Sequence, residues 1–159
     1  MFDSIRKLFV DMDTGGKPSG GFEEGDYRLA AAALLVHAAT IDGTFSEVER
    51  AKLHVVIKQR FDLDDVATDQ LIVAAGVAEQ KAVDLYHFTA LLNRSLDEAA
   101  RARIVEMMWQ IVYADGVVTD FEDNLIWRAA DLLGISRGER IALKERVMAA
   151  ATDGGKSSQ

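Results

Sequence analysis

Four Ser or Thr residues are each followed three positions later by Glu, and each pair precedes a segment with helical apolar spacing. In this arrangement, a capping box, the hydroxyl accepts a hydrogen bond from the backbone N–H three residues on, and the carboxylate accepts one from the first residue's N–H. Because only a helix N-terminus leaves those N–H groups unpaired, the pattern predicts helix starts. The four pairs are Ser46/Glu49, Ser95/Glu98, Thr119/Glu122 and Ser136/Glu139.

Apolar residues recur at helical spacing along most of the chain, and no proline follows Pro18. We therefore expect an all-α fold, a bundle of about seven helices with a short additional helix at the N-terminus. Phe121, Ile141 and Met148 are expected on the apolar faces of the last two helices. The bundle helices are predicted at 24–41, 47–61, 65–80, from 84 onward, 96–114, 120–133 and 137–150.

The N-terminal region has a different character. Phe2, Ile5, Leu8 and Phe9 would share one face of an amphipathic helix, which a glycine-rich tether joins to the rest. This helix could pack back onto the core, or meet a protein partner or a membrane surface; packing or a partner is favoured because so short a helix anchors weakly. The expected organisation is helix and tether 1–21, helical domain 22–151 with halves at about 24–80 and 96–150, and disordered tail 152–159.

An internal repeat links the two halves. A shift of 73 residues places Asp42-Gly43 on Asp115-Gly116 and, just beyond, Ser46 on Thr119. The same shift superposes Glu49 on Glu122 and several apolar residues of the preceding helices. We interpret this as two copies of a helix, Asp-Gly turn and helix unit, related by a pseudo-twofold axis. Two copies with so long a period do not make a solenoid.

The repeated segments resemble a known family. The segments from His37 to Glu49 and from Val112 to Glu122, with Ala114-Asp115-Gly116 in the second, are similar to the TerB-like domain of tellurite-resistance proteins. Leu132-Leu133-Gly134-Ile135-Ser136 is also typical of it, and the likeness covers roughly residues 22–150. The first copy departs from the pattern at Ile41, where alanine is usual. The resemblance implies an all-α bundle with internal symmetry and no enzymatic activity. It also implies divalent-cation binding at the acidic turns, and work in stress-resistance complexes near the membrane.

The acidic turns have two interpretations. Ca²⁺ and Mg²⁺ prefer oxygen ligands, so Asp42 with Glu49, and Asp115 with Glu122, could form a metal site, with Ser46 and Thr119 as possible neutral ligands. Alternatively the two Glu only cap helices and the two Asp only hold turns. The turns do not follow the EF-hand pattern. Whether they would form one site or two stays open.

Composition narrows the remaining functions. A net charge of −8 argues against nucleic acid as a partner and against direct binding of the tellurite oxyanion. The chain has no cysteine, which excludes thiol chemistry, and no nucleophile stands beside a recognisable base, so we expect no enzyme. The histidines, His37, His54 and His87, form no metal-binding motif and are interpreted as structural.

Together these observations predict a non-enzymatic, Ca- or Mg-binding helical module that acts through protein–protein interaction in a tellurite- or stress-resistance assembly. The alternative is a metal-independent helical adaptor. With no secretion signal or membrane-spanning segment in the sequence, the expected location is the cytoplasm, or the inner face of the membrane through membrane-associated partners.

Overall fold

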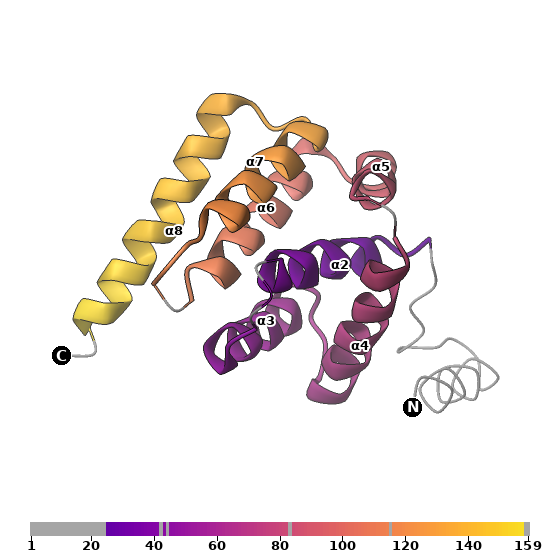
Figure 1. The fold of residues 1–159 in the computed structure, drawn as a ribbon, viewed down its shortest axis with the longest axis horizontal. Helices are drawn as coiled ribbons and strands as arrows, with labels where there is room; N and C mark the ends of the chain where they lie inside the picture. Colours follow the sequence, from indigo (N-terminus) through magenta and orange to yellow (C-terminus); the bar gives the residue numbers. More distant parts are fainter. Residues whose placement is uncertain (1–24, 42, 44, 83, 115, 158–159) are drawn as a thin grey trace.

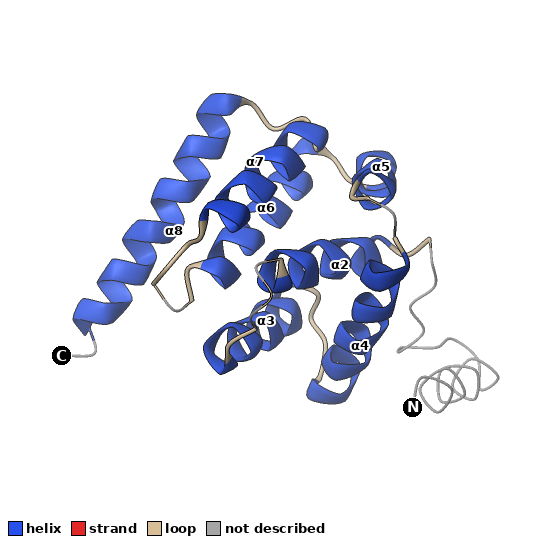
Figure 2. Ribbon diagram, viewed as in Figure 1, coloured by secondary structure: helices blue, strands red, loops and turns tan. Residues whose placement is uncertain are grey.

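The computed structural model describes residues 25–41, 43, 45–82, 84–114 and 116–157. Within these ranges the chain forms seven helices and no strand, which confirms the all-α prediction (Figure 2). The predicted helix 2–12 and the tether 15–21 lie outside the described residues. The helices are α2 (Tyr27–Thr40), α3 (Glu47–Arg60), α4 (Asp65–Lys81), α5 (Tyr86–Ser95), α6 (Glu98–Val112), α7 (Asp120–Leu132) and α8 (Arg137–Ser157).

Helix α2 is the centre of the bundle. It contacts α3, α4, α5, α6 and α7, and Figure 1 shows it between the α6–α8 group and the α3–α4 pair. Its alanine run, Ala30 to Ala33, is at most 2% exposed. Such small side chains let neighbouring helix backbones approach closely, so an alanine-rich helix can be covered on nearly all sides.

The helices of the two halves correspond in order. At the 73-residue offset, α2 corresponds to α6 and α3 to α7, and the buried Leu53 falls on the buried Ile126. Helix α7 is one residue shorter than α3, so the offset becomes 72, at which α4 and α8 correspond and Leu71 falls on Leu143. The repeat therefore includes three helices per copy, with α5 as the connection between them. The pseudo-twofold relation between the copies stays a prediction.

Two of the four predicted capping boxes are complete and one prediction is wrong. Both boxes at the Asp-Gly turns form as expected, and Ser136 Oγ accepts from Glu139 N at 3.2 Å. Ser95, however, is still inside α5, and Asp97 caps α6 by accepting from Ala100 N at 2.8 Å. An ionised carboxylate is a stronger acceptor than a hydroxyl, so the nearer Asp takes the capping position.

Three side chains expected in the core are exposed: Phe121 by 67%, Ile141 by 41% and Met148 by 43%. The face of α8 that packs on α6 is fixed by Leu143 and Val147, one helical turn apart. At 100° per residue, Ile141 and Met148 lie roughly 140° and 120° around the helix from the centre of that face.

Helix α8 continues to Ser157, so most of the segment predicted as a disordered tail is helical. A helix that has already formed adds residues without a new nucleation cost, so α8 continues beyond Ala151 although Gly154 and Gly155 are poor helix formers. No helix in the described part of the chain has both the length and the apolar character needed to cross a bilayer.

Candidate functional site

The two Asp-Gly turns have the same backbone geometry. Gly43 and Gly116 take φ values of +86° and +81°, a left-handed conformation that glycine adopts without steric cost. Each donates its N–H to the carbonyl three residues earlier, on Thr40 and Tyr113, at 3.0 Å in both turns. Their Asp neighbours, at positions 42 and 115, lie outside the described residues. The repeat predicted from the sequence therefore extends to backbone hydrogen bonds.

Each turn leads into a helix whose third residue is a buried glutamate. Glu49 is 4% exposed and Glu122 is 2% exposed. Glu49 Oε1 accepts from both Ser46 N and Ser46 Oγ at 3.2 Å, and Ser46 Oγ accepts from Glu49 N at 3.0 Å. In the second copy, Glu122 Oε1 accepts from Thr119 N at 2.9 Å, and Thr119 Oγ1 accepts from Glu122 N at 3.1 Å. The sequence predicted these bonds but did not predict that both carboxylates would be buried.

A buried carboxylate needs compensation for the water it has lost. Here the capping N–H groups and the positive ends of the α3 and α7 dipoles contribute. No Lys or Arg side chain among the described residues forms an ion pair with Glu49. The described part of the chain also holds no group of three or more His, Asp or Glu side chains arranged for a metal. At each turn it brings together one carboxylate and one hydroxyl.

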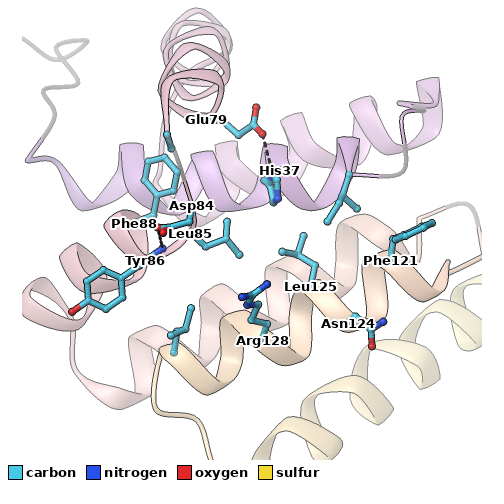
Figure 3. A pocket seen from close by; sticks show the side chains of 13 residues that line it. His37, Glu79, Asp84, Leu85, Tyr86, Phe88, Phe121, Asn124, Leu125 and Arg128 are labelled. Atoms are coloured by element: carbon cyan, nitrogen blue, oxygen red, sulfur yellow. Dashed lines mark hydrogen bonds and ion pairs between the residues drawn. The ribbon is translucent and has the colours of Figure 1, made fainter.

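A second feature, not predicted from the sequence, is a cavity of about 560 Å³ among α2, α4, α5 and α7. His37 and Glu79 meet in its wall with Nδ1 and Oε1 2.7 Å apart, while Arg128 enters it from α7 (Figure 3). His37 was interpreted as a structural histidine, and its hydrogen-bond contact with Glu79 is consistent with that role. Its partner is 42 residues away in the chain and on another helix, so no local pattern could identify the pair.

The rim of this cavity carries two strongly exposed aromatic rings. Tyr86 is 65% exposed and Phe121 is 67% exposed. Both are among the residues that line the cavity, and Figure 3 places them at opposite ends of it. The lining also includes Ile41, the last described residue before position 42. The cavity therefore extends to the edge of the first acidic turn and to the first turn of α7.

Comparison with known proteins identifies the family of the chain. No curated protein and no solved structure matches the chain. The family model described as tellurite resistance protein TerB matches residues 28–145, from the start of α2 into α8. That range is most of the chain and contains both turns, both complete capping boxes and the α5 connection, and the chain therefore belongs to the TerB family of tellurite resistance proteins.

Proposed function

We propose that this TerB domain binds one divalent cation, Ca²⁺ or Mg²⁺, at each Asp-Gly turn, and that the ions set the helix arrangement offered to a protein partner. Membership of the family supports a helical domain associated with tellurite resistance, in a family that is non-catalytic. The proposal adds to this a bound divalent cation and a protein partner.

The observation that carries the proposal is the equivalent burial of Glu49 and Glu122. The two glutamate carboxylates are buried at matching positions. Each follows a turn that contains an aspartate seven residues earlier in the chain. Capping alone does not require a buried glutamate, since Ser136 caps α8 while Glu139, the residue equivalent to Glu49 and Glu122, is only half-buried. A dication would offset the desolvation cost of a buried carboxylate more strongly than neutral N–H groups do.

The ligand chemistry fits a hard cation. Asp42 and Glu49, or Asp115 and Glu122, would supply charged oxygens, and the Ser46 or Thr119 hydroxyl a neutral one. Asp42 follows directly after Ile41, the C-cap of α2, where the helix dipole is negative. A carboxylate at that end is disfavoured by about 0.3–1 kcal/mol, and a bound cation would reverse the effect.

Thermal unfolding in calcium and in chelator tests this proposal. At a calcium concentration of about 100 times Kd, each site adds about 2.7 kcal/mol, which corresponds to a rise in Tm of roughly 5–10 °C for a domain of this size. The double variant Asp42→Asn/Asp115→Asn should lose the rise. Glu98→Gln/Glu145→Gln changes the net charge equally at two exposed positions and should keep it. Equal melting of the wild type with and without calcium would overturn the proposal.

The complete capping boxes favour a second candidate, a metal-independent adaptor. Both close through protein atoms alone, so the helix starts are satisfied without an ion. An adaptor of this kind would melt at the same temperature in calcium and in EDTA, and would hold its partner in excess chelator. A partner complex that dissociates on chelation and re-forms with calcium would exclude it.

A further inference from the structure

The cavity described above continues toward the start of α2. A second cavity, of about 340 Å³, is lined by Leu29 and Ala30 from the first turn of α2 and shares Ala82, Asp84 and Phe88 with the larger one. We call the two together the α5 groove. It runs from the point where the chain enters the bundle to the exposed ring of Phe121 on α7.

From this groove we propose a function for the N-terminal region: residues 2–12 dock in the α5 groove of their own chain as an amphipathic helix and occupy it until a partner displaces them. The inference goes beyond cation binding and does not depend on it. Three features of the chain support it: the exposed apolar surface, the charges, and the reach of the tether.

Exposed aromatic rings at both ends of the larger cavity indicate a surface that another part of the protein covers. Two rings that are each about two-thirds exposed, Tyr86 and Phe121, stand beside the apolar walls formed by Leu85 and Leu125. Tyrosine, other aromatics and arginine are enriched where protein surfaces bind. A helix with Phe2, Ile5, Leu8 and Phe9 along one face would supply the matching apolar ridge.

The charges of the groove and of the segment are complementary. Lys81, Asp84 and Arg128 line the groove, and none of them has an ion-pair partner among the described residues. Asp84 Oδ1 accepts only a backbone bond in that part of the chain, from Tyr86 N at 2.9 Å. The segment from 2 to 12 carries both signs next to its apolar face, with Arg6 and Lys7 between Asp3 and Asp11.

The tether is long enough and enters at the right place. Residues 13–24 can span at most about 40 Å at roughly 3.3–3.6 Å per residue. The wall residue His37 lies ten positions after Tyr27 along α2, which corresponds to about 15 Å at 1.5 Å per residue. The segment can therefore turn back along α2 and reach the groove wall at His37.

The third cavity, about 580 Å³ among α3, α6 and α8, is a poorer site for this segment. Its acidic residue, Glu106, already pairs with Arg60 at 3.3 Å and with Arg146 at 3.5 Å. None of its three helices is the first after the tether, whereas the α5 groove begins on α2, which is.

Cysteine cross-linking tests the proposal in the 159-residue chain, which has no cysteine of its own. Ile5→Cys or Leu8→Cys is combined with Phe121→Cys, and each chain is oxidised mildly at micromolar concentration. Disulfides form only when the two Cα atoms come within about 7 Å. The matched control replaces Phe121→Cys by Val66→Cys, at a residue that is 65% exposed on α4 and lines neither cavity of the groove.

We expect at least one groove pair to form an intramolecular disulfide ten or more times faster than the control pair. Adding Phe2→Asp and Phe9→Asp, which place charges on the apolar ridge, should reduce its rate to that of the control. Equal rates for groove and control pairs would overturn the proposal. So would disulfides that form only between chains, which would mean that the segment of a second copy fills the groove.

Discussion

The two halves of the domain use the same helices and turns but fill their cores differently. Six of the ten buried residues of α2 are alanine, and four of those six fall on Ile or Val in α6: Ala31 corresponds to Ile104, Ala32 to Val105, Ala38 to Ile111 and Ala39 to Val112. The small residues belong to the helix that contacts nearly every other one. The two halves thus share one backbone arrangement, but the central helix α2 carries mostly small side chains and its counterpart α6 carries larger ones.

The halves should differ most in the stability lost when Trp109 and Val36 are each replaced by alanine. These two residues occupy matching positions on α6 and α2. Trp109 is 1% exposed, and Trp109→Ala should lower the free energy of unfolding by about 3–5 kcal/mol. Val36→Ala removes far less area and should cost about 1.5 kcal/mol. Urea denaturation followed by circular dichroism measures both, and Trp109→Phe is the control that keeps most of the apolar volume. Equal losses for the two alanine variants would contradict the assigned difference in packing.

The next largest effect on stability is expected when a larger side chain is placed in α2. Ala38→Ile installs the residue found at the matching position 111, but Ala38 is fully buried in close-packed surroundings. Overpacking of this kind costs about 1–3 kcal/mol. Ala99→Ile, at an exposed position on α6, is the control and should change stability by no more than about 0.5 kcal/mol. A neutral Ala38→Ile variant would mean that α2 is not tightly enclosed.

At the turns, by contrast, the halves should behave alike. Ser46→Ala and Thr119→Ala each remove the hydroxyl of a complete capping box, and each should cost about 1 kcal/mol. Denaturant midpoints measured in chelator separate this effect from any bound ion. A loss confined to one of the two variants would show that the turns are not energetically equivalent.

The smallest effect is expected at the α3–α4 corner, where an ion pair joins the two helices. Lys58 Nζ lies 2.7 Å from Asp65 Oδ1, and that hydrogen bond, assisted by His54, lowers the pKa of Asp65. At the α7–α8 corner the acid is on the earlier helix instead, since Asp131 pairs with Arg140 at 3.0 Å.

Because the folded pKa of Asp65 lies below its unfolded value, its stabilising contribution is present above the ordinary pKa of about 4 and is lost as the pH falls through the folded value. Asp65→Asn should therefore be slightly less stable than the wild type at pH 7, and the difference should disappear in acid. Denaturant midpoints across that range measure the difference. A difference that stays constant with pH would contradict this assignment.

Local patterns predicted the helices and both turn caps because the interactions concerned span only three or four residues. The wrong prediction of a cap at Ser95 also concerns a short-range interaction. A competing acceptor, Asp97, lies two positions further on, and the sequence pattern did not show which of the two would cap the helix. Phe121 illustrates another limit. Periodicity shows that a helix has an apolar face but does not show how far neighbouring helices cover that face. Phe121 is in the first turn of α7, where neighbouring helices leave the apolar face exposed.

The residues of the candidate site were predicted from the sequence, but their burial was not. The capping roles of Glu49 and Glu122 followed from spacing, whereas their burial depends on helices packed over them from elsewhere in the chain. The pairing of His37 with Glu79 likewise depends on α2 lying against α4. Contacts of this kind are set by tertiary packing, for which the sequence has no short-range signal.

The central claim is that each acidic turn holds its own cation, and calorimetric titration with calcium tests it most directly. We expect two calcium ions per wild-type chain, one per chain in either Asp42→Asn or Asp115→Asn, and none in the double variant. Absence of binding to the wild type at millimolar calcium, or a stoichiometry of two that persists in the double variant, would contradict the account.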